Sequence, residues 1–399
     1  MRATAADSTL VIDDVRMLSP ERGFVPGRVV TRDGVIVGAG PEAQIPDQAQ
    51  VGAGGGRRLT PGLIDLHVHG LEHFALDLGP EHLLEAARRW PRYGTTSALP
   101  TLVPQDPRRA PENLAAIAAA LDQAEGVHLP GLHLEGPFMA VSGAGCLVIP
   151  GDLGLLEDLL AASGNRVRVM SLSPDTPNIL PVIERLQERG VVPFVTHTGA
   201  SLEQTQAAIR AGARHATHFY DVFPAPPEYE PGVRTAGAVE AFLTEPGTSV
   251  DFIADGVHVD PVVIRLAVRV LGSRNVALIT DGQVGAGLPP GEYDSPHGFR
   301  VRVEPGNGAR IATLGHKFEG ALAGSALTMN EGIRNLLGWL DLPEEEVWAM
   351  GTANPARIAE LEDVGTLAAG NRADMVLWEE DFTPARVWVG GREQKVETE

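Results

Sequence analysis

Cysteine and lysine are scarce in this sequence of 399 residues, and it has no long apolar run. The one cysteine, Cys146, excludes an internal disulfide framework and agrees with a reducing cytoplasm. No segment approaches the roughly 20 consecutive apolar residues that span a bilayer. The first residues, MRATAADSTLVIDD, lack the basic-then-apolar pattern of a signal peptide. We therefore expect a cytoplasmic protein without a membrane anchor.

Positive charge is also in short supply. Lys317 and Lys395 are the two lysines, and the formal net charge at pH 7 is −20. Such a surface repels nucleic-acid phosphates, so we expect no nucleic-acid partner. An anionic substrate is still compatible with this charge, because a local basic pocket can lie within an acidic surface. The apolar content of 43% is sufficient for a large core.

Both ends of the chain carry patterns of short strands. The first end alternates apolar and polar residues through STLVIDDVRMLSP and GRVVTRDGVIVGAG, with Asp33-Gly34 as a hairpin turn signal. The last end, from Gly365 onward, reads GTLAAGNRADMVLWEE and ARVWVGGREQ. We predict that residues 1–58 and 361–399 fold together as one small β-sandwich domain, and that residues 59–360 form a second, larger domain.

Between these ends, strand patterns alternate with amphipathic helix patterns. The predicted strands span residues 63–69, 95–102, 127–135, 166–173, 191–198, 215–219, 249–255 and 275–281. Ser201 and Gln204 form a capping box at the start of one of the helices. Repeated units of this kind predict an α/β fold, the (β/α)8 TIM barrel, with its active site at the C-terminal strand ends. A doubly wound open sheet is the alternative, but polar residues cluster at strand ends all along the chain.

The ends of those strands carry side chains that bind metals. His67 and His69 end the first strand and share a face, because residues two apart in a strand point the same way. The other side chains of this kind are Glu135, His197, His218 and Asp281. Imidazole nitrogens and carboxylate oxygens suit divalent ions such as zinc or iron. A lone histidine at a strand end is usually structural, but this converging set predicts a site for one or two divalent ions.

The remaining histidines are assigned different roles. His133 shares a face with Glu135, so it lies either in the site or one layer deeper. His258, in DGVHVD, faces the same rim and is predicted to contact the substrate. Others, such as His128 and His215, are interpreted as surface or packing residues.

Many barrel hydrolases bridge two metals with a carboxylated lysine after the fourth strand. Here that strand ends in SLSPD, so Glu135 is the carboxylate best placed to bridge two ions.

A series of motifs runs through nearly the whole chain. It comprises LTPGLIDLHVHG, HLEGPF, VTHTGAS, ATHFYDVF, EPGV, IADGVHVD, LITDG, LAGSALTM, GTANPARIAEL and GTLAAGNRADMV. This series resembles the N-acetylglucosamine-6-phosphate deacetylases of the amidohydrolase superfamily. The resemblance implies Glu135, His197 and His218 as ligands of the main metal, and the retained His67 and His69 as ligands of a second. It also implies Asp281 as the catalytic acid and base, and His258 as the residue that polarises the acetyl carbonyl.

The chemistry expected of such a site fits these residue types. A bound zinc-type ion lowers the pKa of water from about 15.7 to about 7, which supplies hydroxide at neutral pH. Asp281 would take the proton of that water and later deliver it to the leaving amine. The metal and His258 would stabilise the oxyanion of the tetrahedral intermediate.

The sequence departs from the family in the sugar-phosphate pocket. After EGPF the loop reads MAVSGAGCLVIP, without the histidine and the basic residues usual there, and Cys146 in it is interpreted as a packing residue. THFYDVF places Asp221 where an asparagine of the family helps to hold the phosphate. Tyr229 stands where the family has an arginine that reaches the phosphate, often across a dimer interface, and Arg234 is a candidate replacement. The predicted substrate-binding residues are therefore Asp221, Val222, Tyr229, Arg234 and His258.

These features predict a homodimeric, metal-dependent amide hydrolase that removes acetyl from an N-acetyl amino sugar, a small-molecule substrate. The altered phosphate-binding residues motivate an alternative. In it, the chain is a deaminase or an N-acyl amino acid deacylase that acts on a substrate without phosphate. A non-enzymatic scaffold barrel is a third hypothesis, but such proteins usually lose the metal ligands that this chain retains.

Overall fold

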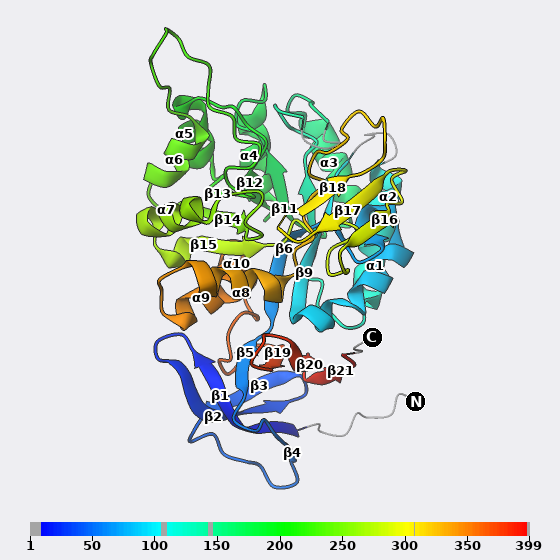
Figure 1. Cartoon of the computed structure of the whole chain (residues 1–399), viewed down its shortest axis with the longest axis vertical. Coiled ribbons are helices and arrows are strands. Elements are labelled where there is room, and N and C mark those ends of the chain that lie inside the picture. Colours follow the sequence, from blue (N-terminus) through cyan, green and yellow to red (C-terminus); the bar gives the residue numbers. More distant parts are fainter. Residues whose placement is uncertain (1–8, 105–109, 143–146, 307, 397–399) are drawn as a thin grey trace.

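The computed structural model describes residues 9–104, 110–142, 147–306 and 308–396. Their strands form an eight-stranded barrel, a second eight-stranded sheet and a three-stranded sheet (Figure 1). β7 (Gly70–Leu71) and β8 (Phe74–Ala75) add a short hairpin. Cys146 lies outside the described residues. No helix in the described part of the chain is long and apolar enough to cross a membrane.

The barrel strands lie in chain order, and each pairs in parallel with the next. They are β6 (Leu63–Val68), β9 (Thr95–Leu102), β10 (Leu132–Glu135), β11 (Val167–Leu172), β12 (Val192–Val195), β13 (His215–Ala216), β14 (Ser249–Ile253) and β15 (Val276–Ile279). The first and last strands are joined beyond β15, because His69 N donates to Gly282 O and Asp281 N donates to His67 O, both at 2.9 Å. The predicted barrel is confirmed, and each observed strand lies within its predicted range.

Helices surround the barrel, as the alternating pattern predicts (Figure 1). They are α1 (Pro80–Ala87), α2 (Ala110–Ala120), α3 (Leu153–Ala162), α4 (Ile179–Glu188), α5 (Leu202–Ala211), α6 (Ala238–Thr244), α7 (Pro261–Leu271), α8 (Met329–Trp339), α9 (Glu344–Met350) and α10 (Ala353–Ile358). Short 3-10 helices are η1 (Leu76–Leu78), η2 (Trp90–Tyr93), η3 (Leu121–Gln123) and η4 (Ser273–Asn275). The predicted capping box is present at α5, where Gln204 N donates to Ser201 Oγ and Ser201 N donates to Gln204 Oε1.

Strands from both ends of the chain form one mixed sheet. They are β1 (Thr9–Ser19), β2 (Gly23–Arg32), β3 (Val35–Gly40), β4 (Gln50–Ala53), β5 (Arg58–Pro61), β19 (Met375–Trp378), β20 (Pro384–Val389) and β21 (Arg392–Gln394). Alternating residues such as Ile12 and Trp388 are fully buried in a core of its own. The turn between β2 and β3 requires positive φ at Asp33 (50°) and Gly34 (82°), which the predicted Asp-Gly pair supplies.

The small sheet lies at the end of the barrel where the strands begin, because β5 continues almost directly into β6 (Figure 1). The sheet therefore leaves the C-terminal strand ends free. β5 ends at Pro61 and α10 ends at Ile358, close to the predicted domain limits at residues 58 and 360. That division of the chain into domains stays a prediction.

A three-stranded antiparallel sheet follows β15 and was not predicted. Its strands are β16 (Gly291–Asp294), β17 (Arg300–Glu304) and β18 (Gly308–Ile311). The signal was present in RVRVE, whose two valines are buried while its charged residues are exposed. Because the insertion follows the last barrel strand, it lies on the side of the barrel where the strands end (Figure 1).

A buried carboxylate ties the start of the first β/α unit to the end of the last strand. Glu72 is 6% exposed, and its carboxylate lies 3.0 Å from Arg89 Nε and 3.2 Å from Arg92 Nη1. Tyr93 donates its hydroxyl to the same carboxylate at 3.0 Å. The backbone of Glu72 exchanges hydrogen bonds with the segment that follows Asp281, since its N–H donates to Ala286 O at 2.8 Å. This network holds the loop after His69 in place.

We predict that Glu72→Gln lowers the free energy of unfolding by about 3 kcal/mol, because two guanidinium groups lose their carboxylate in a largely buried place. Urea denaturation followed by circular dichroism measures the change. Glu292→Gln is the control, since the carboxylate of Glu292 pairs with Arg302 at 2.6 Å on the surface and its loss leaves stability nearly unchanged. Equal stability of the two variants would contradict this role of Glu72.

Candidate metal centre

The structure brings all six predicted metal-binding side chains together at the C-terminal ends of the barrel strands. They are His67, His69, Glu135, His197, His218 and Asp281. Their side chains are between 0% and 13% exposed. Parallel strands of a barrel converge on one mouth, so residues far apart in the sequence meet there.

Glu135 lies between two pairs of histidines. Its Oε1 is 3.2 Å from His197 Nε2 and 3.1 Å from His218 Nε2. Its Oε2 is 3.2 Å from His69 Nε2 and 3.7 Å from His67 Nε2. One carboxylate thus presents each of its oxygens to a different pair of histidines.

Asp281 completes the side of the cluster formed by the first strand. Its Oδ1 is 3.3 Å from His69 Nε2 and 3.7 Å from His67 Nε2, and the two histidine Nε2 atoms are 3.0 Å apart. Two buried groups have all their donor atoms within 4.8 Å of one another, namely His67–Glu135–His218 and His67–His69–Asp281. These nitrogen and oxygen donors are consistent with binding of divalent metal. His197 joins them through Oε1 of Glu135.

The electrostatics of the cluster favour positive charge on two of its histidines. Burial by itself would lower the pKa of His218 and His69, but hydrogen bonds to Glu135 and its charge outweigh burial. They raise these pKa values to about 10 and about 9. Burial would likewise raise the pKa of Glu135, but the surrounding histidines hold it well below its usual value. A divalent ion can supply the same positive charge in place of protons.

Three members of the cluster have a left-handed backbone conformation, which residues other than glycine rarely adopt. The φ angles are 45° at His197, 33° at His218 and 47° at Asp281. Such conformations cost about 1–3 kcal/mol each and persist only where the surroundings hold them. At Asp281 and His218 the surroundings do so, through the Asp281 N–H bond to His67 O and a 2.5 Å bond from His218 N to Asp251. Strain concentrated at these residues indicates a functional site.

Asp251 supports the cluster from the layer below. It is fully buried in β14 and accepts hydrogen bonds from His215 Nε2 at 2.9 Å and from Thr217 Oγ1 at 3.0 Å. Thr217 Oγ1 also lies 3.2 Å from Nδ1 of His67. If that nitrogen carries the proton and donates to Thr217, Nε2 of His67 keeps a free lone pair toward the cluster. Asp251 therefore orients His67 through Thr217 and His218 through its backbone.

His133 and Asp65 also belong to the layer below. Both ring nitrogens of His133 are engaged there, Nδ1 with Leu66 O at 2.7 Å and Nε2 with Ser171 Oγ at 2.6 Å. Burial lowers the pKa of His133 to about 4, so its ring is neutral. Asp65 accepts the hydroxyl of Thr280 at 2.6 Å, and burial raises the pKa of Asp65 to about 7. Of the two positions open to His133, the structure gives the deeper one.

The predicted substrate-binding residues lie in different surroundings. His258 Nδ1 is 2.8 Å from Asp255 Oδ2, and this bond outweighs burial and raises the pKa of His258. Asp221 is close enough for its charge to raise the same pKa, and Val222 follows it with φ of 55°. Tyr229, in contrast, is 77% exposed on the loop between β13 and α6.

Arg234 lies on the same loop, which extends beyond the barrel (Figure 1). Its side chain is 87% exposed and lies 3.3 Å from Glu240 Oε1. In this chain, therefore, the structure brings His258 and Asp221 to the rim of the cluster, while Tyr229 and Arg234 face outward.

Sequence reasoning missed three supporting residues. Asp251 carried a signal, since it is a lone charge in the middle of the apolar strand segment SVDFI. Asp255 precedes His258 by three residues, a spacing that allows a local side-chain bond. His215 was interpreted as a surface or packing residue, but it is buried in β13 and bonded to Asp251. Its partner lies on another strand, which no sequence pattern indicates.

Comparison with known proteins defines the class. A family model described as the amidohydrolase family matches residues 58–393. The N-acetylglucosamine-6-phosphate deacetylase of Vibrio furnissii is 33% identical over 341 residues, 84% of this chain and 82% of that protein. The N-acetylgalactosamine-6-phosphate deacetylase of Escherichia coli O157:H7 is 31% identical over 398 residues, 96% of this chain and 99% of that protein.

A solved structure agrees with these relatives. A variant of the N-acetyl-D-glucosamine-6-phosphate deacetylase from Mycobacterium smegmatis, in complex with N-acetyl-D-glucosamine-6-phosphate, has a TM-score of 0.83 at 26% identity. The match covers 97% of this chain and 99% of that one. The barrel and its donor cluster are those of an amidohydrolase, a hydrolase of carbon–nitrogen bonds other than peptide bonds. Within that superfamily, the chain belongs to the N-acetylglucosamine- and N-acetylgalactosamine-6-phosphate deacetylase family.

We predict that Asp251→Asn weakens metal binding by about 10–100-fold, because the amide cannot accept all the hydrogen bonds that orient His67 and His218. Competition with a chromophoric zinc chelator measures the affinity directly. Asp374→Asn is the matched control, since Asp374 is a buried carboxylate (5% exposed) in the small sheet. Metal affinity equal to that of the unmodified chain in Asp251→Asn would refute this orienting role.

Proposed function

We propose that this chain hydrolyses the acetamido group of an N-acetylhexosamine 6-phosphate, releasing acetate and the amino sugar phosphate. The observation that carries the proposal is the buried cluster of histidines and carboxylates at the mouth of a barrel of the deacetylase family. The proposal includes both the N-acetylglucosamine and the N-acetylgalactosamine substrate, because relatives named for each have nearly the same sequence identity to this chain.

The proposed metal ligands are those that the resemblance to the deacetylase family implies, supported by their close approach at the mouth of the barrel. Glu135, His197 and His218 would hold the main ion, and His67, His69 and Asp281 would hold a second. Zinc or iron suits this set, because every donor is an imidazole nitrogen or a carboxylate oxygen. When bound, such an ion supplies an activated water at neutral pH. Glu135 is the proposed bridge, since each of its oxygens faces a different pair of histidines.

Asp281 and His258 are the proposed catalytic side chains. Asp281 takes the proton of the attacking water and gives it to the departing amine, which cannot leave as an anion. His258 donates a hydrogen bond to the acetyl carbonyl as negative charge develops there. The bond from Nδ1 of His258 to Asp255 at 2.8 Å supports this role, because it fixes the ring and leaves Nε2 to face the substrate.

The residues that would surround the sugar phosphate differ from those of the family. Asp221 and Val222 lie beside His218 and would line the sugar pocket, with Asp221 disfavouring a second negative charge. Arg234 and Tyr229 would reach a phosphate only from their exposed loop, across an interface between two copies. The outward position of these two side chains favours the alternative, an amide hydrolase acting on a substrate without phosphate, such as a deaminase or an N-acyl amino acid deacylase.

We predict that the metal-loaded enzyme deacetylates N-acetylglucosamine 6-phosphate or N-acetylgalactosamine 6-phosphate with kcat/KM at least about 100-fold above that for the unphosphorylated sugar. Two charge-assisted hydrogen bonds of about 1.5–3 kcal/mol each, donated by Arg234 across the interface between two copies, account for such a ratio. An acetate-release assay measures it, before and after removal of metal by a chelator. Equal rates with and without phosphate would favour the alternative, while activity that survives complete metal removal would refute the metal-dependent mechanism.

We also predict how kcat/KM depends on pH on the acidic side. Burial raises the pKa of Asp281 to about 6, and a bound cation lowers it from there. Asp281 must be ionised to accept a proton, so kcat/KM decreases as the pH falls through a pKa at or below about 6. Asp281→Asn loses the base and decreases kcat by about 100- to 10,000-fold. The pH profile, taken with the metal content verified, measures both; activity near that of the unmodified enzyme in Asp281→Asn rules the assignment out.

We propose that the protein is a cytoplasmic homodimer. The single cysteine agrees with a reducing compartment. Helix α7 presents an apolar stripe to solvent, which is the proposed dimer interface. Val262, Leu266 and Val270 are 53%, 46% and 49% exposed and lie one turn apart on one face. α7 is also the helix that follows His258, so an interface there would lie close to the rim of the active site.

We predict that Leu266→Glu converts the dimer into monomers, because association would bury the glutamate carboxylate in an apolar contact, away from water and without a partner. Light scattering coupled to size exclusion measures the mass. Leu180→Glu is the control, since Leu180 is 39% exposed on α4, away from α7. A dimer that persists in Leu266→Glu excludes this face as the interface.

A further inference from the structure

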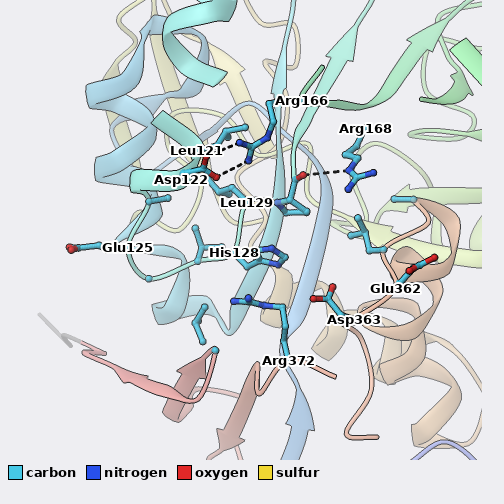
Figure 2. A pocket seen from close by; sticks show the side chains of 18 of the residues that line it. Leu121, Asp122, Glu125, His128, Leu129, Arg166, Arg168, Glu362, Asp363 and Arg372 are labelled. Carbon is cyan, nitrogen blue, oxygen red and sulfur yellow. Dashed lines mark hydrogen bonds and ion pairs between the residues drawn. The ribbon is translucent and has the colours of Figure 1, made fainter. Parts of the chain in front are cut away.

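A large cavity lies at the opposite end of the barrel from the metal centre, against the small sheet. It measures about 1380 Å3, which exceeds the roughly 300–1,000 Å3 of a typical small-molecule site. Its walls come from the segment before β10, the start of β11, the loop after α10 and the strands β20 and β21 (Figure 2). Segments far apart in the sequence thus line one space that is open to solvent.

Arginine side chains line one part of this cavity in an otherwise acidic protein. Arg166 is paired with a carboxylate, since it donates to both oxygens of Asp122 at 2.9 and 3.0 Å. Arg168, two residues along the same strand, makes a long hydrogen bond from Nε to Pro130 O at 3.5 Å. It forms no ion pair with any carboxylate that the structure describes. Arg372 uses Nε for Asp374 at 3.2 Å, which leaves its terminal nitrogens available.

His128 lies between these arginines (Figure 2). Its backbone is held by the neighbouring strand, because His128 N donates to Thr96 O at 2.7 Å. Burial, with the charge of Arg372 next, lowers the pKa of His128 to about 4, so the ring is neutral. Its Nδ1 is buried without a partner, and a buried acceptor without a partner is tolerated better than such a donor. The proton therefore belongs on Nε2, the nitrogen left to donate toward the cavity.

The loop after α10 brings negative charge to the same space. Glu362 and Asp363 both line the cavity, and the carboxylate of Asp363 lies on the side of His128 and Arg372 (Figure 2). The same cavity therefore offers guanidinium and imidazole donors as well as carboxylate acceptors. A plain polyanion would be repelled by the loop, and a plain cation would be repelled by the arginines.

We propose that this cavity binds a small molecule with a phosphate or carboxylate at one end and an ammonium group at the other. The oxyanion accepts hydrogen bonds from Arg168, His128 and Arg372, and the ammonium donates to Asp363 and Glu362. Amino sugar phosphates and free amino acids have this chemistry. The site is separate from the metal centre, and the proposal does not depend on which amide the metal centre hydrolyses.

Calorimetric titration of the metal-loaded full chain tests the proposal. The probes are glucosamine 6-phosphate and glucose 6-phosphate, which differ only at C2, where the first carries an ammonium group and the second a hydroxyl. We expect a binding event in addition to any at the metal centre, about tenfold or more tighter for glucosamine 6-phosphate. Titration of free glutamate distinguishes the two sources, because only a site for amino acids binds it more tightly than the sugar phosphate.

Variants assign the event to the cavity. Arg168→Ala and His128→Phe each weaken it by about tenfold or more for both sugar phosphates. Asp363→Asn removes the preference for the ammonium group. Arg269→Ala, an exposed arginine on α7, is the control and leaves the event unchanged. No additional event, or one that Arg168→Ala and His128→Phe leave intact, would overturn the proposal; turnover at the metal centre, measured on the same variants, is expected to be unchanged.

Discussion

The carboxylate of Glu135, held among four histidines, is the interaction on which this structure depends. Burying charged groups together is costly unless each is paired, and here every pairing crosses from one barrel strand to another. The cluster therefore requires the barrel to be closed, because its members arrive from opposite sides of the mouth. In return, the closed barrel places nitrogen and oxygen donors where a divalent ion can replace protons as the source of positive charge.

The rest of the upper barrel holds this arrangement in place. His197, His218 and Asp281 adopt left-handed backbone conformations that cost energy, and main-chain or carboxylate bonds from neighbouring strands hold two of them. Below them lies a polar layer of Asp65, His133, His215 and Asp251, which replaces the apolar filling usual in a barrel interior. The hydrogen bonds of that layer fix the orientation of the histidine rings above it, as metal sites require.

The two ends of the barrel serve different purposes. At the C-terminal end, strained strand ends and the inserted sheet surround the metal centre. At the N-terminal end, the small sheet covers the barrel incompletely and leaves a cavity lined by charged groups of both signs, among them Arg168 and Asp363, and by His128. The loop carrying Tyr229 and Arg234 extends from the first of these ends into solvent, so substrate contacts from it would depend on a second copy of the chain.

Sequence patterns by themselves determined the barrel, the small sheet and the six donor side chains that meet at the barrel mouth. These are local properties: alternation defines strands, turn residues such as Asp33-Gly34 define hairpins, and donors at strand ends converge in any barrel. The tertiary structure alone decided which donors face one another, because the Nε2-to-carboxylate distances depend on ring orientation and on how β15 closes against β6. It also decided the roles of Asp251 and His215, whose partners lie on other strands. Hydrogen bonds between residues distant in the chain leave no periodic trace in the sequence, which is why the supporting layer and the cavity at the base emerged only from the fold.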